Sequence, residues 1–351
     1  MFGIALVAHV RSIAQKPDRS PLLQLSRLSP NKRLRKLWRK SLREFVARSP
    51  QEFLNVHRRM LQKAPMAHYN FLAVERYPIV SIGKKHSYCL SLDFLDSKLG
   101  IGIMHRLGET FNNKNDSKRF RDFLGDIFEE YINQICRRAF TASFYSKIMY
   151  GRPEQEAADG WVLNPPAAAV IEAKSGFLLL ETTLGGSFEG FEYAFRQTFL
   201  RAAKQLSRVI DDFKASRFEV AGLAANTITI IYPVLVTLRY LPMEAFVADY
   251  IRRELSSNNL LTQPSVRELT IVAAKDLEVV EAQGAHLVDL LAERLTNEEF
   301  KSRSFSDFLY QKYSRGPDGF KPNEHLVSRY RELLSGSAQM LFGRRLGTKK
   351  N

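Results

Sequence analysis

The sequence predicts an α/β protein in which a mixed sheet is flanked by helices. Three observations support this prediction: apolar residues recur at a helical period over residues 118–140, short β-prone runs follow between 161 and 183, and a long helix and a strand come after residue 191. The composition is that of a globular chain, with 45% hydrophobic and 25% charged residues among 351. A wholly disordered or low-complexity protein is therefore excluded.

Residues 1–70 are expected to form a helical and strongly basic N-terminal region. Residues 1–64 hold fifteen Lys and Arg against three acids, a charge of +12 out of the formal total of +15. Apolar residues at helical spacing within residues 32–43 predict a basic amphipathic helix there. The candidate nucleic-acid-binding cations of this segment are Lys32, Arg33, Arg35, Lys36, Arg39, Lys40 and Arg43.

Three interpretations of this basic helix are considered. Nucleic acid is the favoured partner, because each phosphate that a cation neutralises releases condensed counterions. The second interpretation is a solvated helix whose apolar stripe packs on the body of the protein. The third is attachment to a membrane surface.

Cysteine content and hydropathy bear on the compartment. Only Cys89 and Cys136 occur, so neither a disulfide scaffold nor a Cys-rich zinc module is encoded, and a reducing, cytoplasmic setting is expected. No run of about 18 apolar residues exists, so no transmembrane helix and no membrane partner are predicted. A Gly-rich phosphate loop is also missing from the sequence, which argues against an ATP-driven motor.

The remaining elements are expected in a regular succession. Residues 77–99 predict two short strands around a turn at 83–85 and then a short helix. The next elements expected are a helix at 118–140, strands at 161–163, 168–173 and 177–183, a helix at 191–213, a strand at 227–239, and helices after residue 242 with a short strand near 269–273. The predicted organisation is a basic helical region (1–70), a small strand and helix extension (71–117), an α/β core (118–240) and a mostly helical C-terminal region (241–351).

The predicted hairpin at 161–173 brings two acids and a lysine together. Glu172 and Lys174 are two residues apart on one strand, so their side chains point to the same face. A hairpin that turns between residues 165 and 166 pairs residues whose numbers sum to 331, which places Asp159 opposite Glu172 at a Cβ separation of about 5 Å. Two carboxylates so close repel each other unless a cation lies between them, and oxygen ligands suit Mg²⁺ (or Mn²⁺).

The nearby ammonium of Lys174 can orient an attacking water and stabilise charge that develops on a phosphate. The alternative is a salt bridge on a solvated sheet face. Val170 and Ile171 beside these residues indicate that both faces are buried, which favours a site. Glu129 lies next to the apolar stripe of the helix at 118–140 and is a third candidate ligand, with ordinary helix-surface charge as its alternative.

Three strings of residues resemble the motifs of the PD-(D/E)XK nuclease superfamily. They are Gly125-x-x-Phe128-Glu129-x-Tyr131, Asp159-Gly160-Trp161-Val162 and Val170-Ile171-Glu172-Ala173-Lys174. The resemblance covers about residues 118–240, and Ala158 stands where the Pro of the family's name is expected. It implies a restriction-endonuclease-like core, a mixed central sheet flanked by helices in the order αβββαβ, with helical N- and C-terminal extensions.

The resemblance also implies roles for individual residues. Asp159, Glu172 and Glu129 correspond to metal ligands, and Lys174 corresponds to the catalytic lysine. The next helix of the family often contributes a Gln or Lys, for which Gln205 is the candidate and Lys204 a weaker one.

The sequence therefore predicts a Mg²⁺-dependent nuclease that hydrolyses phosphodiester bonds, with DNA as the favoured substrate and defence against foreign DNA as its role. The first alternative is a catalytically silent, nuclease-like subunit that binds nucleic acid within a larger complex. The second is a structural protein whose helical ends recruit partners. The protein partners considered are a second copy of the chain in a homodimer and another protein in a multi-subunit system.

Overall fold

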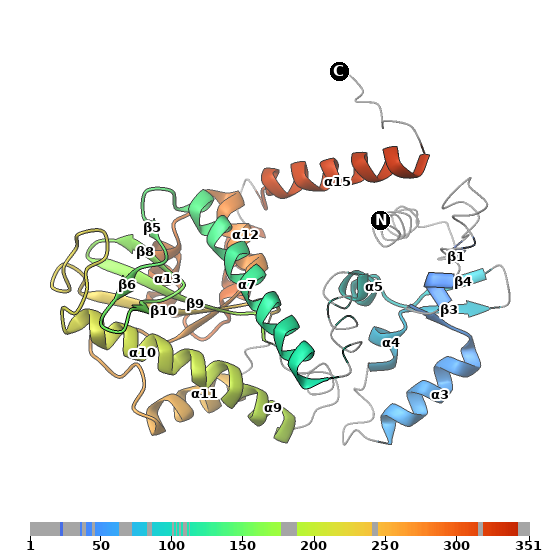
Figure 1. The fold of residues 1–351 in the computed structure, drawn as a ribbon, viewed down its shortest axis with the longest axis horizontal. Helices are drawn as coiled ribbons and strands as arrows, with labels where there is room; N and C mark the ends of the chain where they lie inside the picture. Colours follow the sequence, from blue (N-terminus) through green and yellow to red (C-terminus); the bar gives the residue numbers. More distant parts are fainter. Residues whose placement is uncertain are drawn as a thin grey trace. The chain divides into compact units, whose positions relative to one another are not determined.

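The computed structural model (Figure 1) describes residues 22–23, 36, 40–43, 46–62, 72–82, 86–99, 102, 104, 107, 111, 113–176, 188–240, 245–314 and 319–342. The chain divides into two compact units. Unit 1 comprises Met1–Phe120, Leu179–Phe191 and Ser328–Asn351, and unit 2 comprises Arg121–Leu178 and Glu192–Val327. The predicted hairpin and its acids lie in unit 2.

Unit 1 contains a four-stranded sheet in the order β1-β4-β3-β2. Its strands are β1 (Leu22–Leu23), β2 (Ala47–Arg48), β3 (Ile79–Ile82) and β4 (His86–Cys89), and its helices include α3 (Pro50–Leu61), α4 (Leu72–Arg76) and α5 (Leu92–Leu99). The hairpin β3–β4 and the helix α5 confirm the prediction for residues 77–99. The two-residue strands β1 and β2 were not predicted, because so short a segment has no hydrophobic period.

Helix α3 begins where local chemistry dictates. Ser49 is its N-cap: the Ser49 Oγ accepts a hydrogen bond from Glu52 N (3.3 Å), and Ser49 N donates to Glu52 Oε2 (2.9 Å). Pro50 takes the first helical position, where no N–H is needed.

Unit 2 is built on a five-stranded mixed sheet in the order β11-β10-β9-β8-β5. The strands are β5 (Phe144–Tyr145), β8 (Gly160–Asn164), β9 (Ala167–Lys174), β10 (Ile230–Thr237) and β11 (Thr270–Ala273), and β6 (Met149–Tyr150) and β7 (Gln155–Glu156) form a separate small hairpin. Strand β8 is antiparallel to β5 and β9, whereas β10 is parallel to both β9 and β11. This sheet confirms the α/β class.

Helices cover both faces of this sheet (Figure 1). The described helices from residue 114 onward are α7 (Lys114–Ala139), α9 (Phe188–Phe195), η3 (Arg196–Leu200), α10 (Arg201–Lys214), α11 (Ala245–Ser257), α12 (Ala274–Gln283), α13 (Leu287–Thr296), α14 (Phe305–Ser314) and α15 (Glu324–Phe342). One core joins α7, α12, α13 and α14 to the sheet face that carries Ile171 and Val234. On the other face α10 packs against β9, and the rings of Trp161 and Phe213 lie 5.0 Å apart.

The predicted helices at 118–140 and 191–213 are confirmed by α7 and by the continuous helical stretch from α9 to α10. Cys136 is confirmed as a core residue; it is fully buried, and burial raises the pKa of its thiol to about 12. The third predicted strand, at 177–183, lies outside the described residues. Within the described part of the chain, no helix has both the length and the apolarity that a membrane span requires.

The predicted division at residue 240 does not coincide with a boundary between the two units. Strand β11 extends the sheet beside β10, and α12, α13 and α14 share the core of unit 2. The physical reason is that β10 is buried and needs a parallel neighbour, which the chain supplies only after it has passed through α11.

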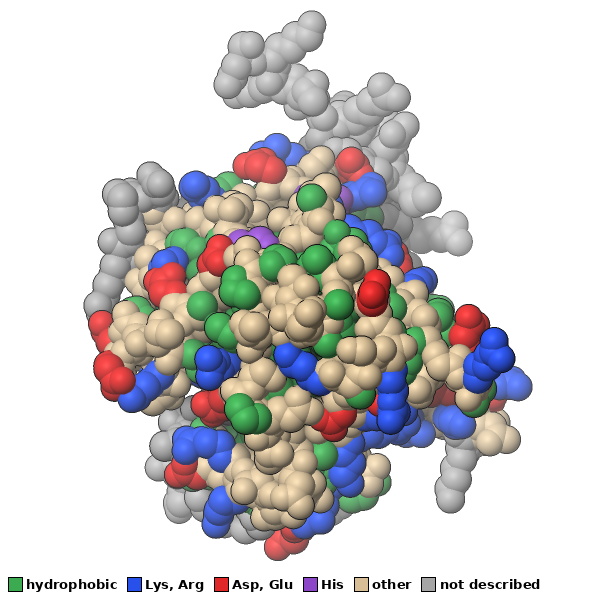
Figure 2. Space-filling model, turned by 90° about the vertical axis from the view of Figure 1, so that its left-hand side faces the viewer, with side chains coloured by type: hydrophobic (Ala, Val, Ile, Leu, Met, Phe, Trp, Pro, Cys, Tyr) green, Lys and Arg blue, Asp and Glu red, His purple; other side chains and the backbone are tan. Residues whose placement is uncertain are grey.

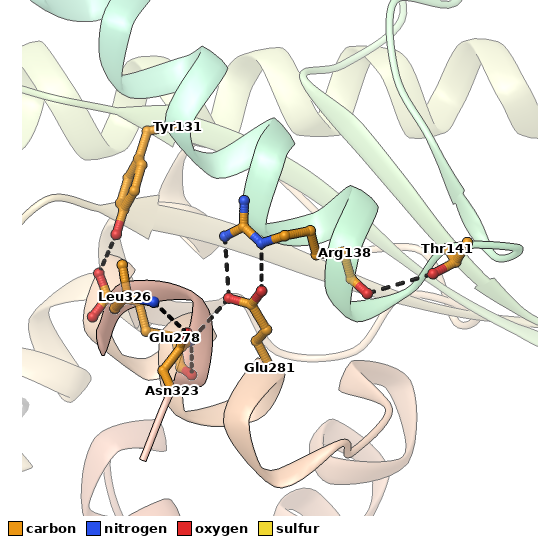
Figure 3. Close-up of polar contacts among 7 residues, drawn as sticks. All are labelled: Tyr131, Arg138, Thr141, Glu278, Glu281, Asn323 and Leu326. Carbon is orange, nitrogen blue, oxygen red and sulfur yellow. Dashed lines mark hydrogen bonds and ion pairs between the residues drawn. The ribbon is translucent and has the colours of Figure 1, made fainter. Parts of the chain in front are cut away.

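Polar contacts tie α7 to α12 and to the start of α15 (Figure 3). Arg138 donates two hydrogen bonds to Glu281, at 2.5 and 3.2 Å, and Tyr131 donates to Glu278 at 2.5 Å. Asn323 donates to Glu281 (2.9 Å) and to the backbone oxygen of Glu278 (3.0 Å). Burial alone would raise the pKa of Glu281, but the hydrogen bonds from Arg138 and Asn323 hold it below its usual value.

Candidate functional site

The β8–β9 hairpin has the register that the sequence predicts. Gly160 pairs with Ile171, so the numbers of the partners sum to 331, and residues 165–166 form a two-residue turn. Asp159 immediately precedes β8 and therefore lies across from Glu172, at the end of the hairpin away from the turn.

Glu172 is a buried acid, and among the described residues the cation that contacts it is Lys174, two positions further along β9. Its side chain is on the α10 face of the sheet, since Val170 pairs with Trp161 and the strand alternates with a period of two. The residue is 4% exposed, and the Lys174 Nζ donates a hydrogen bond to the Glu172 Oε1. Burial raises the pKa of Glu172, and the ammonium of Lys174 opposes that rise.

Asp159 is the second acid of the pair. Its Oδ2 accepts a hydrogen bond of 2.6 Å from the backbone N–H of Ala173. Burial, and then the negative charge of Glu172, raise the pKa of Asp159 to about 7; the hydrogen bond from Ala173 and the charge of Lys174 act in the opposite direction. At neutral pH, Asp159 is therefore protonated in a fraction of the metal-free molecules.

Two further acids share this electrostatic environment. Glu129, on α7, has a raised pKa, chiefly because it is half-buried and then because of the charges of Asp159 and Glu156. Glu156, on β7, is exposed and raises the pKa of Glu129, Asp159 and Glu172 alike. Glu156 was not among the predicted site residues. Its position three residues before Asp159 was a signal in the sequence, but the β6–β7 hairpin that carries Glu156 was not predicted.

Gln205 lies on α10, the helix that packs against β9. Its Oε1 is buried, and within the described residues it has no hydrogen-bond donor. Gln205 also makes no hydrogen bond to Asp159, Glu172 or Glu129 in this part of the chain. The structure therefore groups Asp159, Glu172, Lys174 and Glu129, and leaves Gln205 as a buried amide on the helix above the same face.

Of the predicted nucleic-acid-binding cations, Lys36, Lys40 and Arg43 are described, and all three are exposed on helical backbone in unit 1. Lys32, Arg33, Arg35 and Arg39 lie outside the described residues. Leu42, from the apolar stripe of the same segment, is 1% exposed. Leu42 thus packs inward while these three cations face solvent, as expected where a basic amphipathic helix covers a core.

Unit 2 presents mixed charges on the face seen in Figure 2. Lys and Arg side chains among its described residues are interspersed there with Asp, Glu and hydrophobic side chains. The basic excess of the chain therefore resides in the N-terminal sequence, where residues 1–64 contribute +12, and not on this face of unit 2.

The acids fit a divalent cation only in part. Within the described residues, no three His, Cys, Asp or Glu side chains converge closely enough to hold a metal ion. The donor chemistry of Asp159 and Glu172 nevertheless suits Mg²⁺, which commonly takes one or two protein carboxylates and completes its shell with water and phosphate oxygens. The pair fits such a two-carboxylate site, provided that Glu172 exchanges its contact with Lys174 for the cation.

Comparisons with protein-family models, with curated proteins and with solved structures returned no match to this chain. The structure itself defines an α/β protein whose mixed sheet carries a buried carboxyl group, that of Glu172, and a half-buried one, that of Asp159, beside an ammonium group. This pair is the feature with the clearest chemical potential, because buried acids of like charge are unfavourable without a counterion.

Proposed function

We propose that this protein is a metal-dependent nuclease that hydrolyses phosphodiester bonds in DNA, on a restriction-endonuclease-like core. The observation that carries the proposal is the meeting of Asp159 and Glu172 across the β8–β9 hairpin, with a raised pKa for both acids and the Lys174 ammonium on Glu172. The order α7, β5, β8, β9, α10, β10 along the chain supports the core assignment. Defence against foreign DNA in the cytoplasm is the proposed role.

The repulsion between the two acids supports a cation-binding role. The fold keeps both carboxyl groups in a largely buried position, where ionisation of one hinders ionisation of the other. Such an arrangement lowers stability unless a ligand compensates for it. Asp159 and Glu172, with Glu129 nearby, would hold Mg²⁺ or Mn²⁺, and the bound ion would supply positive charge for the phosphate and acidify a water molecule.

The chain's own residues supply the rest of the chemistry. Once a cation takes its place on Glu172, the Lys174 ammonium is available to position the attacking water and to stabilise negative charge that develops on the phosphate. The exposed cations Lys36, Lys40 and Arg43 of the basic segment would bind the sugar–phosphate backbone through its charge.

One observation favours the alternative of a catalytically silent, nuclease-like subunit. Glu172 is engaged by Lys174, and the described residues contain no convergent set of three metal donors. In that case the acids are a relic, and the protein binds nucleic acid within a larger complex without cutting it.

The test uses the purified full chain with supercoiled plasmid, single-stranded DNA and RNA, in Mg²⁺ or Mn²⁺ and then in EDTA. Cleavage of DNA is expected with either cation, and EDTA should abolish it. Asp159→Asn and Lys174→Ala should each slow cleavage by about 100-fold or more. The matched controls are Asp122→Asn and Lys321→Ala, which alter exposed residues outside the site and should leave the rate unchanged.

The outcomes separate the hypotheses. Undiminished cleavage by Asp159→Asn or Lys174→Ala refutes the site. A wild-type chain that binds DNA in a salt-dependent way but cuts none of the substrates supports the silent subunit. A chain that neither binds nor cuts nucleic acid overturns both and supports a structural role.

A further inference from the structure

A second polar site lies at the β11 edge of the sheet in unit 2. Here a hollow of about 50 Å³ is lined by residues from α11, the start of β11, the end of α13 and the segment that leads into α14. This volume is the space open to a water-sized sphere, and one buried water needs about 10–15 Å³ of it. The hollow therefore holds roughly three to five water-sized groups. That is the size of a single tetrahedral oxyanion and much smaller than a nucleotide.

Arg294, on α13, is the central residue of this hollow. It is 9% exposed; its Nε donates to the backbone oxygen of Arg303 (2.9 Å) and its Nη1 contacts the Thr270 Oγ1 at 3.5 Å. In the described part of the chain, no carboxylate lies within 4 Å of its guanidinium group, and its Nη2 has no acceptor. A buried cation without a counterion is unfavourable, and burial accordingly lowers the pKa of Arg294.

The rim of the hollow adds further positive charge. Arg252, Lys301 and Arg303 line it together with Arg294, against a single acid among the described lining residues, Glu268. Among the described residues, Glu268 makes its ion pair with Arg252, whose Nε lies 3.6 Å from the Glu268 Oε1. The negative charge of Glu268 acts against the lowering of the Arg294 pKa by burial.

The rim cations have partners outside the lining. Lys301 contacts Glu298 at 2.5 Å, Arg303 contacts Glu299 at 3.8 Å, and Arg252 contacts Asp249 at 3.0 Å. Each of these partners is more than half exposed, and exposed pairs contribute little to stability. The rim cations can therefore turn to a ligand at little energetic cost.

The N-terminus of α14 also borders the hollow. Ser304 is its N-cap, with the Ser304 Oγ accepting a hydrogen bond from Asp307 N at 3.0 Å, and both Ser304 and Phe305 line the hollow. The peptide dipoles at the N-terminal end of a helix favour an anion. The N-terminus of α14 therefore adds to the attraction for an anion, which comes chiefly from the buried guanidinium group of Arg294.

We propose that this hollow binds an oxyanion of the phosphate class, held by Arg294 at its base and by Lys301 and Arg303 at its rim. The planar fork of a guanidinium group matches two oxygens of a phosphate. The same chemistry is offered by free inorganic phosphate and by the terminal phosphate of a DNA strand. The lining of the hollow includes neither Asp159 nor Glu172, and the proposal does not rest on the proposed nuclease activity.

The proposal is tested by calorimetric titration of the full chain in EDTA at constant ionic strength, with sodium phosphate as ligand and sodium chloride as control. Saturable binding of phosphate is expected. The double variant Lys301→Ala/Arg303→Ala should bind phosphate about tenfold more weakly or worse, since one lost charge-assisted hydrogen bond already weakens binding about tenfold. Lys321→Ala, which removes an exposed cation outside the hollow, should bind as the wild type does.

Two further measurements complete the test. Arg294→Met should remove phosphate binding. Because the change removes a buried charge but also the hydrogen bond to the Arg303 backbone oxygen, thermal unfolding is measured alongside to establish that the variant is folded. Oligonucleotides with and without a 5′-phosphate identify the source: tighter binding of the phosphorylated strand assigns a DNA end, and equal binding assigns the free anion. Absence of saturable phosphate binding, or unchanged binding by Lys301→Ala/Arg303→Ala, overturns the proposal whether or not the chain cuts DNA.

Discussion

Replacing Asp159 by Asn should stabilise the metal-free protein at pH 8, although the same change should slow the proposed cleavage of DNA by about 100-fold or more. Asp159 has a pKa of about 7 in place of its ordinary 3.8, first because it is buried and then because of the charge on Glu172. An acid with a raised pKa in the folded state binds its proton more tightly when folded. Its contribution to stability is therefore present in full below about pH 4 and is lost as the pH rises through about 7.

The size of the effect follows from the same values. At about 1.36 kcal/mol for each pH unit, a change from 3.8 to about 7 corresponds to about 4 kcal/mol above pH 7. Burial is the larger cause of this shift, and the smaller cause is the repulsion shared with Glu172, whose pKa is also raised; removing the charge of Asp159 should therefore recover about 1–4 kcal/mol. Asn retains an oxygen that can accept the 2.6 Å hydrogen bond from Ala173, so loss of that bond should not mask the gain.

The assay is urea unfolding of the wild type, Asp159→Asn and the control Asp122→Asn in EDTA at pH 4 and pH 8. The free energy of unfolding of Asp159→Asn should exceed that of the wild type at pH 8, and most of the difference should vanish at pH 4. Added Mg²⁺ should then stabilise the wild type at pH 8 and leave Asp159→Asn unchanged. A variant that is less stable than the wild type at pH 8 in EDTA would show that burial and the charge of Glu172 do not penalise the ionised form of Asp159, and the reasoning would fail.

Two further predictions concern contacts within unit 2, one between β5 and β8 and the other between α7 and α12. In Gly160→Ala, the new Cβ would lie 2.5 Å from the Phe144 ring, so the variant should lose about 1–3 kcal/mol of stability in urea unfolding, and the second change Phe144→Leu should restore part of it; no loss in Gly160→Ala would contradict the close approach of β5 to β8. Glu281→Ala leaves Arg138 and Asn323 without their acceptor and should cost about 1–3 kcal/mol at pH 7. Because the pKa of Glu281 is lowered, that difference should shrink as the pH falls below about 4, and a pH-independent difference would refute the ion-pair explanation.

The sequence was sufficient where structure depends on residues close along the chain. The hydrophobic period of residues 118–140 predicted α7, and the sum rule for a turn at residues 165–166 predicted the pairing of β8 with β9. That pairing by itself places Asp159 across from Glu172. A hairpin is readable in this way because its two strands are joined by a turn, so one turn position sets every cross-strand neighbour.

What the sequence determined by itself is the set of local elements and the residues that one hairpin brings together. Only the tertiary structure decided that β11 completes the sheet, that Glu156 joins the acids, and that Arg294 is buried with no carboxylate within 4 Å in the described chain. These features depend on contacts between segments far apart in sequence. Periodicity reports which side of an element is apolar, whereas the neighbour that covers it is selected by packing over the whole unit.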